Sequence, residues 1–194
     1  MKNKKLLLGI AWAWLTCLSA NAEVKLPAFF SDGMVMQQQT RANLWGTATP
    51  NAPVKITTSW DKQTYKTIAD AKGAWKLALS TPSAGGPYTI TFDDGKLTEI
   101  RDILMGELWL CSGQSNMEMP MKGFKNQPVE NSNTDVMNSR NPQLRLFTVK
   151  RSSSFTPKTD VVGTWQEAVP ATVREFSATA YYFGRMIQQL SLIH

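Results

Sequence analysis

The residues best suited to chemistry lie in the stretch GELWLCSGQSNMEMP, at positions 106–120. Its apolar run, 107–111, predicts a short strand buried on both faces that ends in a Ser-Gly pair. Glycine permits a sharp turn there, and Ser115 would follow at the carboxyl end of the strand, where α/β sheets bind ligands. The next residues are expected to open a helix whose first N–H groups can face an oxyanion. Ser115 is therefore a candidate nucleophile for acyl transfer.

A serine nucleophile needs a base, and the sequence contains one histidine, His194, as its last residue. A terminal residue is rarely held well enough to act as a base. The stretch also differs from the G-x-S-x-G elbow, because Met117 replaces the second glycine. Ser115 can thus be interpreted as a nucleophile or as a polar turn residue.

The first 22 residues have the three parts of a secretory signal. Three lysines precede an apolar run, 6–18, and Ala20-Asn21-Ala22 supplies the small residues that a signal peptidase reads. The run is too short for a transmembrane helix, which needs about 20 apolar residues. We expect cleavage near Ala22 and export to the periplasm or the extracellular space. A lipid anchor at Cys17 is the alternative.

Composition narrows the functions of the remaining chain. The formal net charge of +6 includes the three signal lysines, so the exported protein is less basic than the whole sequence. No basic stripe is interleaved with aromatic residues, which argues against nucleic-acid binding. Cys111 would then be the only cysteine, so no internal disulfide can form, and its apolar neighbours predict a buried side chain.

Residues 23–105 follow the pattern of a small antiparallel β-sandwich domain. Apolar and polar side chains alternate in short runs, as at 54–59, 75–80 and 88–92, and turns rich in Gly, Pro and Asp separate these runs. A period of two places one face in a core and the other in solvent.

Residues 106–194 have the pattern of an α/β domain. A second strand is predicted at 144–150, and apolar residues at spacings of three and four predict a helix at 174–190. The connecting segments, 124–142 and 151–173, are expected to be mostly loop. Two strands and one helix form the opening of such a domain rather than a complete one.

Four stretches resemble a single family. GELWLCSGQSNMEMP, with the core GQSNM at 113–117, is similar to the first sequence block of the SGNH hydrolases. The likeness is to the version carried by sialate O-acetylesterases and related carbohydrate acetylesterases. Three further stretches look like the same group: LPAFFSDGMVMQQ at 26–38, LWGTATPNAPVKI at 44–56 and FSATAYYFGRMI at 176–187.

The resemblance implies a β-sheet domain ahead of a flavodoxin-like α/β/α domain. It also implies hydrolysis of acetyl esters on sugar hydroxyls, typically of O-acetylated sialic acids, without a metal or organic cofactor. Ser115 matches the family nucleophile, and its backbone N–H would help to hold the oxyanion. The second family block falls near 176–178, which makes the Ser177 N–H a candidate second donor. Capping the helix that begins there is the alternative role of Ser177.

The chain departs from the family downstream of these blocks. The block that completes the oxyanion hole and the Asp-x-x-His block that carries the base do not occur in the sequence. We therefore expect residues 106–194 to be an incomplete SGNH domain, and the chain to be an amino-terminal fragment of an esterase. Its own activity should be low, because loss of triad function costs on the order of 10⁴–10⁶ in rate.

A non-catalytic, secreted carbohydrate-binding protein is the alternative function, with the β-sandwich as its working part. Exposed aromatic side chains such as Trp45, Trp60 or Trp75 would then stack on sugar rings. Trp75 is in register with apolar strand residues and is expected to be buried, whereas Trp60, beside charged residues, is expected to be exposed. The sequence leaves both the acetylated glycan and the oligomeric state open.

Overall fold

The protein is described here by a computed structural model that covers residues 23–191. The expected signal segment, 1–22, and His194 lie outside these described residues. The strands and helices of the described part are β1 (Val35–Gln37), β2 (Arg41–Thr47), β3 (Pro53–Thr58), β4 (Thr64–Ile68), β5 (Ala74–Ser80), β6 (Gly85–Asp93), β7 (Leu97–Gly106), α1 (Ser115–Glu118), α2 (Ser132–Met137), β8 (Asn141–Phe147), β9 (Trp165–Ala168), α3 (Pro170–Glu175) and α4 (Ala178–Ser191).

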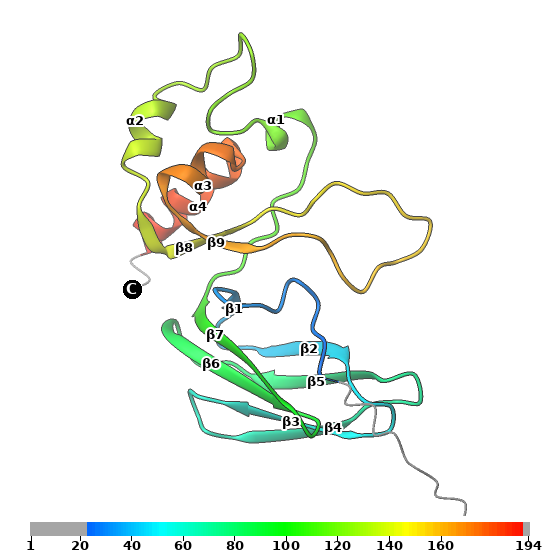
Figure 1. The fold of residues 1–194 in the computed structure, drawn as a ribbon. Helices are drawn as coiled ribbons and strands as arrows, with labels where there is room; N and C mark the ends of the chain where they lie inside the picture. Colours follow the sequence, from blue (N-terminus) through cyan, green and yellow to red (C-terminus); the bar gives the residue numbers. More distant parts are fainter. Residues whose placement is uncertain (1–22, 192–194) are drawn as a thin grey trace, which may run out of the picture.

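The amino-terminal half is built from β-strands around one hydrophobic core (Figure 1). Among the described residues, one sheet has the strand order β1-β7-β6-β3-β4, and β2 pairs with β5 in a separate antiparallel ribbon. Side chains from both, such as Ile56, Phe92 and Leu79, are fully buried in that core. The expected short strands are therefore confirmed, although β1 pairs with β7 in parallel. The domain boundary after residue 105 stays a prediction, and β7 runs past it to Gly106.

The carboxyl-terminal half has a core of its own between a hairpin and helices. Strands β8 and β9 pair in antiparallel fashion and lie between the sheets and the helices (Figure 1). Leu146, Val173 and Tyr181 are buried in this second core. The predicted strand at 144–150 is present but begins at Asn141, and β9 lies in a segment expected to be loop. No helix within residues 23–191 is long and apolar enough to cross a membrane.

The predicted buried strand at 107–111 is wrong. This segment has no regular secondary structure and is exposed, with Leu110 at 92% accessibility. A strand buried on both faces needs a strand beside it and helices over it, and no strand of the described part pairs with this segment. The Cys111 side chain is exposed for the same reason, so the expectation of a buried thiol is also wrong. Trp109 instead packs edge-on against Phe183.

The helix predicted at 174–190 is divided into two. Helix α3 ends at Glu175, and α4 begins at Ala178. The residues between them are extended because their backbone pairs with the chain that follows α1. The Met121 N–H donates to the Phe176 carbonyl over 2.9 Å, and the Ala178 N–H donates to the Met119 carbonyl over 2.8 Å.

A buried arginine joins the two halves. The Arg145 side chain, on β8, is only 5% exposed, and its guanidinium donates to both carboxylate oxygens of Asp102 over 2.6 and 3.1 Å. It also donates to the Gly33 carbonyl over 3.3 Å. Asp102 reaches this position because β7 carries an extra residue relative to β6 there, and a β-bulge of this kind redirects a side chain. Its φ of 56° is one that Asp tolerates better than most residues.

The side chain of Asp102 provides a test of this joint. Asp102→Asn should lower the free energy of unfolding by about 2 kcal/mol, because the buried guanidinium then loses its nearer carboxylate and keeps only that of Glu167, 3.7 Å away. Urea denaturation of the variant and the parent measures the difference. Glu99→Gln is the matched control on the same strand; its pair with Arg101 is exposed, so stability should hardly change. Equal losses in both variants would contradict a structural role for the Arg145–Asp102 pair.

Candidate active site

Ser115 is the first residue of α1, a single helical turn. The turn forms because the Gln114 carbonyl accepts the N–H groups of Met117 and Glu118 over 2.9 and 3.1 Å. The expectation that a helix opens directly after the serine is therefore confirmed. The Ser115 side chain is exposed, and its hydroxyl has no hydrogen-bond partner within residues 23–191. A first helical residue also keeps its own N–H free of the helix ladder.

The stretch around Ser177 lies beside the one around Ser115. Pro120 and Ser177 form an isolated β-bridge, and the Thr179 hydroxyl donates to the Asn116 carbonyl over 3.1 Å. The Ser177 hydroxyl contacts the Met117 sulfur at 3.4 Å. Two motifs some sixty positions apart in the sequence are thus neighbours in space.

Ser177 caps the helix that follows it. Its Oγ accepts the Ala180 N–H over 3.3 Å, and its carbonyl accepts the Tyr181 N–H over 2.9 Å. This is the alternative role that the sequence left open. The cap uses the hydroxyl and the carbonyl but not the Ser177 N–H, so capping and donation to an oxyanion are compatible.

A cavity of about 1090 Å³ opens beside Ser115. It lies between β8, α4 and residues 107–114, which we call the serine segment. Among its charged lining residues, Arg145 is already held by Asp102, and Arg151 pairs with Glu118 over 3.0 Å. Its apolar lining includes Leu108, Trp109, Leu144, Leu146, Phe176 and Phe183. The cavity is large enough for a sugar unit and is mainly apolar, with the serine at its wall.

No catalytic base accompanies Ser115 in the described part of the chain. The single histidine of the sequence, His194, lies outside residues 23–191. The carboxylates that line the cavity are committed to other groups: Glu118 to Arg151, Glu175 to Lys122, and Glu107 to two glutamines. The described residues therefore supply a nucleophile and candidate donors without a visible proton acceptor.

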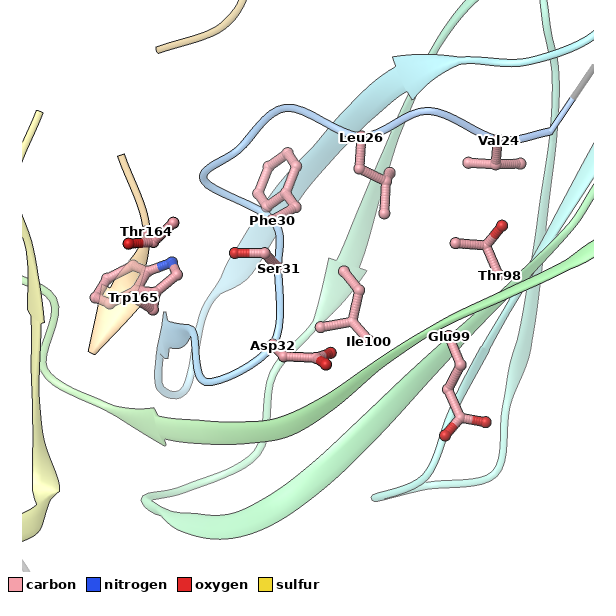
Figure 2. Close-up of a pocket in the computed structure, with 10 residues that line it drawn as sticks. All are labelled: Val24, Leu26, Phe30, Ser31, Asp32, Thr98, Glu99, Ile100, Thr164 and Trp165. Atoms are coloured by element: carbon pink, nitrogen blue, oxygen red, sulfur yellow. The ribbon is translucent and has the colours of Figure 1, made fainter. Parts of the chain in front are cut away.

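A second, shallower groove of about 430 Å³ lies on the sheet-rich half (Figure 2). Figure 2 shows Leu26 and Ile100 pointing toward each other across it. Its carboxylates are both engaged by Arg101, whose backbone N–H donates to Asp32 and whose guanidinium pairs with Glu99. This groove presents few free polar groups to a ligand.

The three tryptophans proposed as sugar platforms are all used internally. Trp75 is 4% exposed, as expected. Trp60 is half-buried rather than exposed, because its indole N–H donates to the Ser80 carbonyl and its ring packs on Tyr88. Trp45 packs on Phe30 and donates to the Thr159 carbonyl over 3.0 Å, so it holds the loop between β8 and β9.

A polar cluster that the sequence analysis did not identify fixes α4 against α2. The Tyr182 hydroxyl and the Arg185 guanidinium each donate to the Asp135 carboxylate over 2.7 Å. These hydrogen bonds, from Arg185 first and then Tyr182, lower the pKa of Asp135. Burial and the neighbouring carboxylate raise the pKa of Tyr182 to about 12. No local sequence signal marks the cluster, because Asp135 lies some fifty positions from Tyr182 and Arg185.

The Asp135 cluster predicts a pH-dependent contribution to stability. Because the folded pKa of Asp135 is lowered, its contribution is present above its unfolded pKa of about 4 and is lost as the pH falls through the folded value. Asp135→Asn should therefore lower the free energy of unfolding by about 1–2 kcal/mol near neutral pH. Denaturant titrations at neutral and strongly acidic pH should show this gap closing in acid. A gap that is independent of pH would contradict the assignment.

The chain is similar to known proteins in structure and in sequence. A carbohydrate acetylesterase from Xanthomonas citri has a similar structure, with a TM-score of 0.81 and 32% sequence identity. That match covers 88% of this chain and 38% of the other. No protein-family model matches the chain.

The curated relatives are more specific. Sialate O-acetylesterases of Pongo abelii and Homo sapiens are each 28% identical over 185 residues, which cover 86% of this chain and 35% of each relative. The enzyme of Rattus norvegicus is 28% identical over 84% of this chain. The resemblance seen in the sequence is thereby confirmed: the chain is a relative of the sialate O-acetylesterases and carbohydrate acetylesterases. It spans about a third of the length of these curated relatives.

Proposed function

We propose that residues 23–191 form the nucleophile-bearing part of a carbohydrate acetylesterase of the SGNH type. The observation that carries this proposal is the pairing of the stretches around Ser115 and Ser177 at the wall of one large cavity. The named relatives are sialate O-acetylesterases, so O-acetylated sialic acids or related acetylated sugars are the proposed substrates. Export through residues 1–22 is part of the same proposal.

In this account Ser115 Oγ attacks the carbonyl carbon of the acetyl ester. The hydroxyl proton passes to a base, and the negative charge that develops on the carbonyl oxygen is held by the N–H groups of Ser115 and Ser177. The sugar oxygen leaves with a proton, and water then releases acetate from the acetylated serine. The described residues supply no base, so the base and the rest of the SGNH domain would come from polypeptide beyond residue 191. Residues 106–191 alone would then form an incomplete domain with little turnover.

The alternative function, non-catalytic carbohydrate binding, has less support. Each of the three tryptophans that would form a stacking surface packs on other residues, and two also donate an indole N–H within the protein. A binding protein would also have no need to hold a serine at the start of a helical turn. We therefore favour the esterase.

Acetyl transfer to Ser115 can be tested in the 194-residue chain with a base supplied from solution. Incubation with 4-nitrophenyl acetate should acetylate Ser115 slowly, and added imidazole should accelerate the reaction by taking over the role of the missing base. Mass spectrometry of the peptide that contains residues 112–118 locates the acetyl group. Ser115→Ala should abolish this modification.

Ser112→Ala is the matched control, because that serine lies in the same exposed segment and plays no part in the proposed chemistry. It should be acetylated at Ser115 as fast as the parent. Two results would contradict a nucleophilic role for Ser115. One is acetylation of Ser112 in the parent as fast as that of Ser115, and the other is no acetylation of Ser115 in the parent with imidazole present.

A further inference from the structure

Two consecutive glutamines hold the first residue of the serine segment. Gln37 Nε2 donates to one carboxylate oxygen of Glu107 over 3.0 Å, and Gln38 Nε2 donates to the other over 2.9 Å. Gln37 is the last residue of β1 and Gln38 follows it, in the stretch LPAFFSDGMVMQQ, which resembles the relatives but has no part in the chemistry proposed above. We call these three side chains the Gln-Glu-Gln clamp.

Backbone N–H groups fix the orientation of both amides. The Leu108 N–H donates to Gln37 Oε1 over 2.9 Å, and the Ala84 N–H donates to Gln38 Oε1 over 2.8 Å. Each amide must therefore turn its NH₂ group toward Glu107. Residue 107 has to accept a hydrogen bond on both of its terminal atoms, and an ionised carboxylate is the side chain that does so. The same two hydrogen bonds lower the pKa of Glu107.

The clamp is the main polar anchor of the segment that leads to Ser115. Between Gly106 and Gln114 the chain has no regular secondary structure, and within the described residues its backbone makes no other hydrogen bond to the sheets than the one from Leu108 to Gln37. Its apolar side chains are largely exposed, although Trp109 packs edge-on against Phe183. Glu107 therefore sets the direction in which the chain leaves β7 on its way to α1.

We propose that the Gln-Glu-Gln clamp positions the serine segment, so that the sheet-rich half acts as the support of the nucleophile. Gln37, Gln38 and Glu107 are positioning residues in this account, because they act on Ser115 through the segment. Glu107 also lines the cavity, but both of its carboxylate oxygens accept from the glutamines. The proposal rests on the proposed function only for the role of Ser115 at the end of the segment. The hydrogen bonds of the clamp do not depend on that function. It gives the stretch MQQ a role that neither the cavity nor the serine explains.

The test uses a nitroxide label on Cys111, which is exposed and lies between the clamp and Ser115. The full chain with Cys17→Ser carries the label at a single thiol. Glu107→Gln places an NH₂ group opposite one of two fixed NH₂ groups, so the electron paramagnetic resonance lines of the label should narrow as the segment becomes more mobile. Glu99→Gln, the same change in an exposed pair on β7, should leave the spectrum unchanged.

Exchange of the two partners distinguishes the clamp from a general loss of structure. In the double variant Gln37→Glu with Glu107→Gln, residue 37 accepts from the Leu108 N–H and from the new amide, and Gln38 donates to the remaining amide oxygen. The spectrum should therefore return to that of the parent. Glu107→Gln should also slow the imidazole-assisted acetylation of Ser115 about tenfold or more, because small displacements of a reacting group are costly, and the exchange should restore it.

The outcomes separate this inference from the proposed function. Unchanged label mobility in Glu107→Gln, or a double variant no better than the single one, would overturn the clamp whatever the acetylation assay shows. Narrowed lines that recover in the double variant support the clamp even if Ser115 is never acetylated, a result that would count against the esterase instead.

Discussion

The Arg145–Asp102 ion pair is the contact on which the arrangement of the molecule depends. Arg145 belongs to β8, which lines the cavity, and Asp102 belongs to β7, whose end leads to Ser115. Aromatic contacts extend the same joint, since Phe29 packs on Phe147 and its carbonyl accepts the Trp165 indole N–H. The buried guanidinium tolerates few other positions, because separating it from Asp102 leaves its charge with only the more distant Glu167 carboxylate, 3.7 Å away. The sheet-rich half and the cavity are therefore held in one orientation.

This constraint explains why much of the family-like sequence lies far from the serine. The turn at 31–33 presents the Gly33 carbonyl to Arg145, and the two glutamines at the end of β1 and just after it hold Glu107. The sheets thus position the site through two sets of contacts. Asp102 and the Gly33 carbonyl hold β8, and the two glutamines hold the start of the serine segment. A stretch such as LPAFFSDGMVMQQ accordingly serves to position the site, and its Phe29 and Val35 also line the cavity.

The pattern of apolar and polar residues predicted those elements that depend on interactions between residues close in the sequence. Alternation at 54–58 predicted β3, and the residues after Ser115 formed the expected helical turn. The prediction of a buried strand at 107–111 was wrong because burial of a strand depends on the strands that pair with it and the helices that cover it. The residues of the run itself carry no information about those partners. The break at Phe176 and the cluster around Asp135 depend on partners about fifty positions away, beyond the reach of any periodicity. Ser115 was identified from residue types and spacing and Ser177 through resemblance, and the structure shows them on neighbouring stretches.

The central claim is that Ser115 attacks an acyl carbon while two backbone N–H groups hold the oxyanion. A crystal structure of the chain after reaction with a serine-directed phosphonate tests it most directly, because the phosphonyl oxygen occupies the place of that oxyanion. The account predicts phosphorus bonded to Ser115 Oγ, with this oxygen about 3 Å from the N–H groups of Ser115 and Ser177. An adduct on another residue, or an oxygen that points away from both N–H groups into solvent, would contradict the account.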